Sequence, residues 1–414
     1  MTSRRPWFPA RMMTIVFVVV TAGMIGLGTA GCTHDDGATR NDRGASSRRS
    51  ESTGPDTATK PDDDADQGGG IPARPASLDP QRTLSIHLLD VGQGAATLLE
   101  FPCGAVLVDT GGELNASFDS RSALKAQLDA FFLRRTDLNR TLDSLIITHP
   151  HIDHLRGVPI LLQDITVKNV VDNGDPGDDD LVRNEMGVLR SYIDTQPTGH
   201  RSIRADDIVK RNGLTDEVID PIACRDVDPV IRVLWGGLDH DPGWGTDNYG
   251  KPRFANQNNH SVVLRVDFGA ASILITGDLE DVAIRGLITR YEGTRWLDVD
   301  IYQAGHHGSA NGTTKDLVDV TTPALALIAM GDPLRQHAWT AWAYGHPRAG
   351  VVNLLEDGVQ LGRPPTEVLV AKGVKRFTGR TIDRAIFGTG WDGAVAVDIT
   401  NDGEMSVRRR QRGR

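Results

Sequence analysis

The sequence predicts an α/β fold, and this prediction follows from two observations. Short apolar, β-branched runs that are typical of buried strands alternate with segments that have the apolar spacing of helices. Such alternation is typical of domains in which helices cover a sheet. Histidines and aspartates also follow directly after several strand-like runs, where a rigid scaffold places a loop-built site.

The first part of the domain is predicted to run from strands to a helix and back to strands. Glycine-rich turns separate the first three strands, and the fourth strand leads into a histidine-rich loop. The strands are expected at Thr83–Leu89, Ala95–Glu100, Val106–Val108, from Leu145 and at Thr166–Val171, and the helices at Ser122–Arg135 and Leu155–Leu162.

The segment from about 172 to 258 is polar and irregular, and we expect it to be an insertion with one helix near Asn184–Thr195. The α/β alternation then resumes. The strands expected around and beyond the segment are Val230–Leu234, His260–Asp267, Ala271–Thr276, Val299–Gln303, Ala324–Met330 and Val395–Ile399, and the helices are Leu279–Arg290 and Ala349–Glu356.

Residues 1–32 have the layout of a signal peptide. Arginines precede an apolar run from Met12 to about Leu27, and small residues then lead to Cys32. The ending Thr-Ala-Gly-Cys resembles the lipobox of bacterial lipoproteins. It implies lipidation of Cys32 and a lipid anchor in the bacterial cell envelope, with the protein facing the periplasm or the exterior. An uncleaved membrane anchor and ordinary secretion are the alternatives.

Residues 33–82 are rich in Asp, Ser, Gly, Arg and Pro, and we expect a disordered tether ahead of a domain over 83–414. The net charge of −10 gives the chain no overall basic character, so any nucleic-acid contact would need a local patch. Beyond Cys32, two cysteines remain, Cys103 and Cys224. They form either a disulfide or two separate thiols, because spacing alone does not fix connectivity.

The strongest chemical signal is a loop that begins after Thr148. His149 and His151 are two residues apart, so in extended backbone both rings leave the same side and can hold one divalent metal. Asp153 and His154 are placed at the turn into a helix, where they could hold a second metal. Imidazole and carboxylate ligands suit Zn²⁺, with Mn²⁺ or Fe as competitors.

Further metal-type residues lie near other strands. Asp278 follows a strand and is expected to bridge two metals, or to cap the next helix, or both. One of His306 and His307 should complete the second metal, and His260 is a candidate third ligand of the first. We expect Asp153 and Asp278 to be the catalytic carboxylates.

Four residues are expected to support the site. His346 and Ser309 are candidates for substrate binding, the latter beside a backbone turn that can accept an anion. Asp109 is expected to accept hydrogen bonds from the neighbouring ligand loop, and Asp90 to be structural near the site.

Seven short segments, taken in order, resemble the soluble metallo-β-lactamase-like domain of the ComEC family of DNA-uptake proteins over about residues 83–400. The resemblance implies an αβ/βα four-layer sandwich with a dinuclear site at one edge. The segments begin at Asp90 (DVGQG), Asp109 (DTG), His149 (HxHxDH), Asn258 (NNxS), Thr276 (TGD), His306 (HHGS) and Tyr344 (YGHP).

These features together predict a metal-dependent hydrolase with two zinc ions that activate water. By resemblance, the substrate would be DNA or another phosphodiester outside the cytoplasm, and the protein would be related to competence. No polytopic channel is expected in this chain, so it would not translocate DNA by itself. The alternatives are a phosphocholine-ester or other ester hydrolase and, from another class, a lipid-anchored binding module without catalysis.

Overall fold

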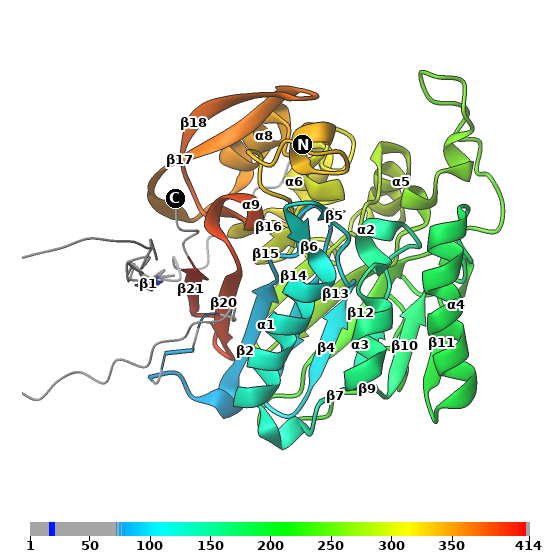
Figure 1. The fold of residues 1–414 in the computed structure, drawn as a ribbon, viewed down its shortest axis with the longest axis vertical. Helices are drawn as coiled ribbons and strands as arrows, with labels where there is room; N and C mark the ends of the chain where they lie inside the picture. Colours follow the sequence, from blue (N-terminus) through cyan, green and yellow to red (C-terminus); the bar gives the residue numbers. More distant parts are fainter. Residues whose placement is uncertain (1–15, 21–71, 73, 76, 411–414) are drawn as a thin grey trace, which may run out of the picture. The chain divides into compact units, whose positions relative to one another are not determined.

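The computed structural model describes residues 16–20, 72, 74–75 and 77–410, and its two main sheets confirm the α/β prediction (Figure 1). The first sheet has the order β1–β21–β20–β2–β3–β4–β8–β10–β11. Its strands are β1 (Val16–Val20), β2 (Thr83–Leu88), β3 (Thr97–Glu100), β4 (Ala105–Val108), β8 (Ser144–Ile146), β10 (Asn169–Asp172), β11 (Gly199–Ser202), β20 (Val395–Thr400) and β21 (Met405–Arg410).

The second sheet has the order β12–β13–β14–β15–β16–β19. Its strands are β12 (Val230–Trp235), β13 (Val263–Phe268), β14 (Ala271–Ile275), β15 (Ile301–Gln303), β16 (Leu325–Ile328) and β19 (Ile386–Gly388). Three two-stranded ribbons accompany the sheets: β5 (Leu114–Asn115) with β6 (Phe118–Asp119), β7 (Thr141–Leu142) with β9 (Thr166–Val167), and β17 (Gly362–Gly373) with β18 (Arg376–Arg384).

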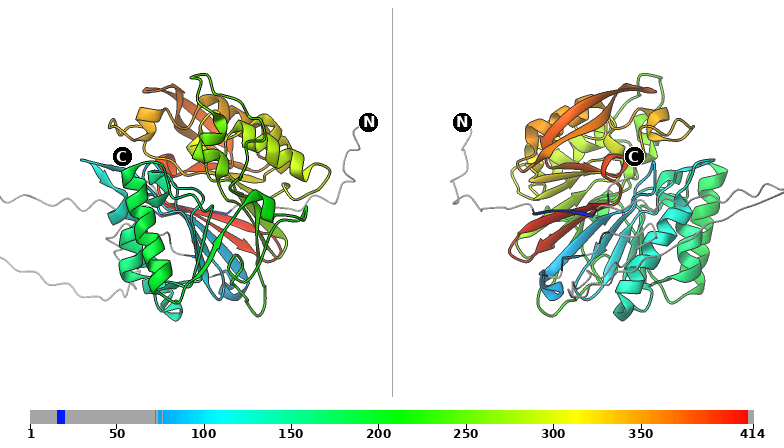
Figure 2. Two further views of the ribbon diagram at one scale, coloured as in Figure 1. Left: turned by 90° about the vertical axis from the view of Figure 1, so that its right-hand side faces the viewer. Right: turned by 60° about the vertical axis from the view of Figure 1, so that its left-hand side comes forward.

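Helices lie outside the two sheets, which gives the four layers (Figure 2). The helices are α1 (Ser120–Arg134), α2 (Ile152–Leu155), α3 (Val158–Asp164), α4 (Asp180–Thr195), α5 (Asp281–Tyr291), α6 (Lys315–Thr321), α7 (Ala341–Tyr344), α8 (Ala349–Gly358) and α9 (Thr389–Asp392).

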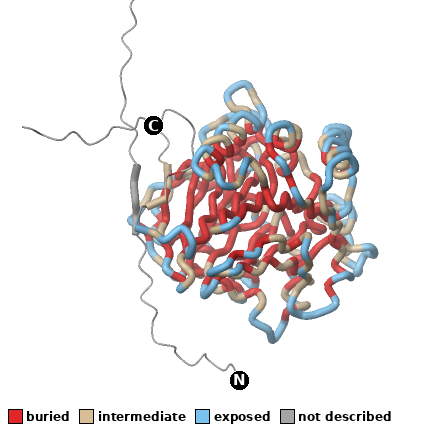
Figure 3. Tube along the Cα trace, turned by 90° about the horizontal axis from the view of Figure 1, so that it is seen from below, coloured by how far each residue is buried: buried red, intermediate tan, exposed pale blue. Residues whose placement is uncertain are grey.

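Successive side chains of a strand point to opposite faces of the sheet, so the first sheet contributes to two hydrophobic cores. Leu84, Ile86 and Leu88 of β2 point into a core shared with the second sheet, whereas Leu98 of β3 and Leu107 of β4 join a core under helices α1, α3 and α4. Figure 3 shows the buried chain concentrated in the sheets and the exposed chain in the outer helices and loops. Both faces of the central strands are therefore covered, which explains their nearly continuous apolar sequences.

Parallel strand pairing brings the functional segments to one edge. β4 pairs in parallel with β8 in the register Val108↔Ile146, so the residues after these two strands lie side by side. In the second sheet, β14, β15 and β16 are parallel in turn. Ligands are commonly bound beyond the carboxyl ends of parallel strands, and every histidine or aspartate expected at a strand end falls here.

The segment 172–258 is more integrated than its polar sequence predicts. Helix α4 buries Val182, Met186 and Leu189 in the outer core, and β11 extends the first sheet by pairing with β10. A further difference concerns residues 257–260, which form a 3₁₀ turn (Gln257–His260) instead of opening strand β13. The predicted antiparallel pairing of β13 with β14 is confirmed.

The N-terminal predictions fall mostly outside the described residues. Cys32 and nearly all of the expected tether are not described, and of the expected signal peptide only β1 is, which pairs in parallel with β21. The end of the expected tether belongs to the fold, because the guanidinium of Arg74 lies 3.1 Å from the buried carboxylate of Glu100. Among the described residues, no helix is long and apolar enough to cross a membrane.

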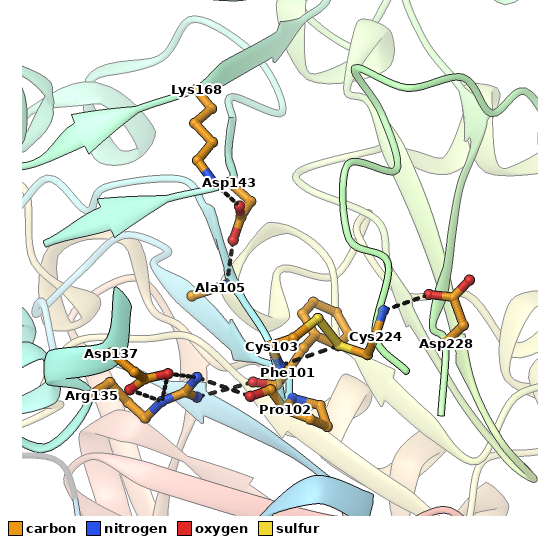
Figure 4. Close-up of a disulfide and its surroundings, with 10 residues drawn as sticks. All are labelled: Phe101, Pro102, Cys103, Ala105, Arg135, Asp137, Asp143, Lys168, Cys224 and Asp228. Atoms are coloured by element: carbon orange, nitrogen blue, oxygen red, sulfur yellow. Dashed lines mark hydrogen bonds and ion pairs between the residues drawn. A yellow bond between two sulfur atoms is a disulfide. The ribbon is translucent and has the colours of Figure 1, made fainter. Parts of the chain in front are cut away.

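A disulfide joins Cys103 to Cys224, which settles the alternative left open by the sequence (Figure 4). Cys103 lies in the turn between β3 and β4, and Cys224 lies 121 residues later, in the segment that precedes β12. Arg135 fixes the same turn by donating hydrogen bonds to the carbonyl oxygens of Phe101 and Pro102. The disulfide therefore fastens the segment before β12 to the first sheet.

We expect the double variant Cys103→Ser/Cys224→Ser to lose about 2–4 kcal/mol of unfolding free energy, because its unfolded chain is no longer cross-linked. Urea denaturation followed by circular dichroism measures this loss. Wild-type protein in reductant should match the variant, and reductant should not change the variant further. An unchanged denaturation midpoint in the variant would contradict the expectation.

Candidate metal centre

Four side chains from both sheets converge at the shared edge. Asp153 and His154 follow β8, Asp278 follows β14, and His307 follows β15. One ligand-type atom from each lies within 4.8 Å of all the others. His154, His307 and Asp278 are buried, and Asp153 is partly exposed, so the group faces solvent on one side only.

His154 is held by Asp109. Nδ1 of His154 lies 2.7 Å from Oδ2 of Asp109, and the same carboxylate accepts hydrogen bonds from the backbone N–H and the hydroxyl of Thr148, both at 2.8 Å. Asp109 adopts a left-handed backbone conformation, with φ of 59°, at the end of β4. This arrangement fixes the ring of His154 and leaves its Nε2 directed toward Asp278, 3.3 Å away.

His307 is oriented by the backbone. Its Nδ1 donates to the carbonyl oxygen of Ala329 at 2.8 Å, so its Nε2 points into the group, 3.2 Å from Asp153 and 3.3 Å from Asp278. Both His306 and His307 have positive φ, an unusual conformation for residues with side chains, and it turns the chain sharply after β15. Such strain is frequent at functional sites.

Positive and negative groups face one another in this cluster and shift each other's pKa values. Burial alone would lower the pKa of His307, but the carboxylates of Asp278 and Asp153 outweigh it and raise the pKa to about 10. Burial would raise the pKa of Asp278, but His307 and His154 hold it well below its ordinary value. Burial would also raise the pKa of Asp153, but its hydrogen bond with His307 lowers it. Both carboxylates are therefore charged, as ligands to a cation must be.

His149 and His151 lie beside this group. Nε2 of His149 and Nδ1 of His151 approach to 3.0 Å, and the rings of His149 and His154 are 4.2 Å apart. Burial and the neighbouring His154 hold the pKa of His149 well below its ordinary value, so its ring is neutral. Nε2 of His149 and Nδ1 of His151 lie close enough together to be ligands of one ion.

The prediction of His260 as a ligand is corrected by the structure. Its Nδ1 accepts a hydrogen bond from the N–H of Leu238 at 3.0 Å, and its Nε2 donates to the carbonyl oxygen of Phe254 at 2.7 Å. The ring packs edge-on against Phe254, with centroids 5.0 Å apart. Since backbone groups occupy both nitrogens, His260 has a structural role.

The remaining predicted residues are distributed around the group. His306 lies at its edge, with Nε2 3.8 Å from Asp278, and His346 lines the adjoining cleft. Ser309 does not line the cleft, and its hydroxyl donates to Asn311, so the structure does not support substrate binding by this side chain. Asp90 lies in the turn after β2, where its carboxylate accepts from the N–H of Gly92 at 3.4 Å.

The group opens into a cleft of about 300 Å³. Its walls include residues that the sequence analysis did not assign to the site, although two of them are aspartates and three stand in the quoted motifs (Gln93, Asn258 and Tyr344). They are Gln93, Ile152, Asp178, Asp179, Asn258, Trp339 and Tyr344.

Close backbone packing also supports the ligand loop. A Cβ atom on Gly112 would lie 2.0 Å from Cα of Asp153, so only glycine fits here. In the sequence, Gly111 and Gly112 indicate that the backbone after Asp109 packs closely against the ligand loop.

The donor set fits a divalent metal. Nε2 of His154 is buried and forms no hydrogen bond within the described part of the chain, but it faces the carboxylates of Asp278 and Asp153 at 3.3 and 4.0 Å. Two imidazoles and two carboxylates at this separation match the ligands that zinc, manganese and iron take in proteins. Asp153, His154, Asp278 and His307 would hold one ion, and His149 and His151 would contribute to a second.

Comparison with known proteins agrees with this arrangement. A family model described as the metallo-beta-lactamase superfamily matches residues 89–332. The chain is 26% identical over 285 residues to ComE operon protein 3 of Bacillus subtilis (strain 168), covering 66% of this chain and 30% of that protein. It is 24% identical over 298 residues to competence protein ComA of Neisseria gonorrhoeae, covering 71% of this chain and 33% of that protein. The chain thus spans about a third of the length of these curated relatives.

Solved structures with related folds are more distant in sequence. The metallo-beta-lactamase fold protein YhfI from Bacillus subtilis is 12% identical, with a TM-score of 0.32, and the match covers 59% of this chain and 85% of that one. The family match extends over more than half of the chain and includes all four converging side chains. The chain belongs to the metallo-beta-lactamase superfamily.

Proposed function

We propose that the protein is a metal-dependent hydrolase that cleaves phosphodiester bonds outside the cytoplasm. The observation that carries this proposal is the convergence of Asp153, His154, Asp278 and His307, three of which line an open cleft while His154 lies buried behind them. When bound there, divalent metal would lower the pKa of water and neutralise charge on the phosphoryl oxygens.

The chain itself supplies a rigid frame for this chemistry. The carboxylate of Asp109 fixes the ring orientation of His154, and the carbonyl oxygen of Ala329 fixes that of His307. On the cleft wall, the side-chain carbonyl of Gln93 accepts from the N–H of Gly331, and its Nε2 lies 3.3 Å from Nδ1 of His346. Preorganised groups of this kind stabilise a transition state without reorganising during the reaction.

Two observations support a location outside the cytoplasm. The Cys103–Cys224 disulfide is typical of an oxidising compartment, and the predicted signal peptide ends at a cysteine with a lipobox-like context. We therefore propose that Cys32 carries a lipid that anchors the protein in the envelope.

Phosphocholine esters are a second candidate substrate class. Asp178 and Asp179 line the cleft, and their carboxylates favour a substrate that carries a positive charge near its phosphate. Comparing p-nitrophenyl phosphocholine with bis(p-nitrophenyl) phosphate distinguishes the two classes.

We expect the full chain, purified and loaded with Zn²⁺ or Mn²⁺, to hydrolyse bis(p-nitrophenyl) phosphate and to contain about two metals per chain. His151→Ala should lower both the metal content, measured by elemental mass spectrometry, and the rate, because it removes a ligand. His240→Ala, which changes an exposed histidine outside the cleft, is the matched control. Absence of metal-dependent turnover on both p-nitrophenyl substrates and on single-stranded DNA would remove the proposal. A chain without metal would favour a binding module.

Asp109→Asn should weaken metal binding by about 10- to 100-fold, because the amide no longer offers two equivalent acceptors to Thr148 and His154. Competition with a chromophoric chelator measures this affinity. Asp239→Asn, an exposed aspartate in the loop after β12, should have no effect. Equal affinities for wild type and Asp109→Asn would show that the carboxylate does not position the ligand.

Cys32→Ser should move the protein from the membrane fraction to the soluble fraction, because the lipid attaches to this sulfur. Fractionation and labelling with a fatty-acid analogue measure the change. Wild type that is unlabelled, or a variant that stays in the membrane fraction, would refute lipid anchoring.

A further inference from the structure

A series of aromatic rings runs from the metal ligands to the mouth of the cleft. The ring of His307 stacks on that of His346, with centroids 6.3 Å apart and planes at 27°. His346 stacks on Tyr344 at 5.7 Å and 19°, and Tyr344 meets Trp339 edge to face at 6.2 Å and 61°. All four residues line the same cleft.

The outer member of the series, Trp339, is placed against the usual preferences of a folded chain. Its side chain is 68% exposed, and its backbone has φ of 61°, a conformation that is an outlier for a bulky residue. Neither exposure of the indole nor this backbone conformation helps folding. Strain and exposed aromatic surface at a cleft are both features of ligand-binding positions.

The loop that carries Trp339 is fixed at both ends. The buried hydroxyl of Thr340 donates to the carbonyl oxygen of His337 at 2.7 Å and caps α7. Arg335 forms an ion pair with the buried Glu113 at 2.6 Å, and its guanidinium lies over the ring of Phe118. Trp339 is therefore presented on a rigid support, so little entropy is lost when a ligand contacts it.

We propose that Trp339 and Tyr344 form a stacking subsite for a planar unsaturated ring carried by a phosphate ester whose phosphate lies at the metal group. This subsite rests on the proposed function, because the phosphate is placed at the metal group, where the ring series begins with His307. Stacking of a base on an aromatic side chain strengthens binding by roughly 5- to 150-fold.

A flat ring fits this geometry better than a quaternary ammonium. Ammonium groups are bound best within a cage of several ring faces. Here Trp339 and Tyr344 meet edge to face, and both remain exposed to solvent. A flat group can lie along such a surface.

Negative charge in the cleft limits the length of the substrate. Asp178 and Asp179 are exposed carboxylates of the cleft lining. Oδ1 of Asn258, another lining residue, is buried and has no hydrogen-bond partner among the described residues, whereas its Nδ2 donates to Glu280. These three residues offer hydrogen-bond acceptors and negative charge, which repel additional phosphates. The ester that fits is therefore short.

Calorimetric titration of the full, metal-loaded chain tests the subsite with adenosine 5′-monophosphate and ribose 5-phosphate, which share a phosphate and a sugar but differ in the ring. Wild type should bind the first at least 5-fold more tightly. In Trp339→Ala the ratio of the two affinities should fall to about 1, and in Trp339→Phe it should be largely retained. Tyr249→Ala, an exposed tyrosine in the loop between β12 and β13, is the control and should keep the wild-type ratio.

Equal affinities in wild type, or a preference that survives Trp339→Ala, would overturn the subsite, as would failure of both compounds to bind. If phosphocholine shows a gain over inorganic phosphate that Trp339→Ala removes, while the nucleotide shows none, the rings bind a cation instead. Binding is measured without turnover. A ring preference in a chain that hydrolyses no phosphodiester would therefore refute the proposed function and leave the subsite standing.

Discussion

The candidate metal centre depends on the buried carboxylate of Asp109. It accepts hydrogen bonds from the backbone and hydroxyl of Thr148, and it holds Nδ1 of His154. The parallel register of β4 with β8 places it there, because Asp109 and Thr148 follow strands whose ends are adjacent. A carboxylate without these donors would be costly to bury, so the loop and the carboxylate stabilise each other.

Local patterns made much of the fold predictable. The strands β4, β8 and β14 are buried on both faces, so their sequences are nearly continuous apolar runs that predict strands. A polar segment of the site follows each run. The hairpin of β17 and β18 was not resolved from the sequence, because its burial pattern is mixed and its strands carry exposed charges. The packing of the segment 172–258 against the outer core was not predictable, because α4 carries several charged residues and buries only Val182, Met186 and Leu189.

Contacts between distant residues were not predictable from one sequence. The sequence around His260 is compatible with a metal ligand. Only the structure shows that both ring nitrogens form hydrogen bonds with the backbone of Phe254 and Leu238. The ion pair of Arg335 with Glu113 joins residues 222 positions apart, and no local signal connects them. The proposed role of Trp339 follows from its exposure and its backbone conformation, and neither can be predicted from the sequence.

Ligands drawn from both sheets have a consequence for the lifetime of the protein. Asp153 and His154 extend from the first sheet, and Asp278 and His307 extend from the second, so an ion held by all four would cross-link the two halves. A ligand that binds only the folded state stabilises it by about 2.7 kcal/mol at one hundred times its dissociation constant. Resistance to unfolding and proteolysis would then rise and fall with the divalent metal concentration of the surroundings. The fold would thus sense metal supply through its own stability.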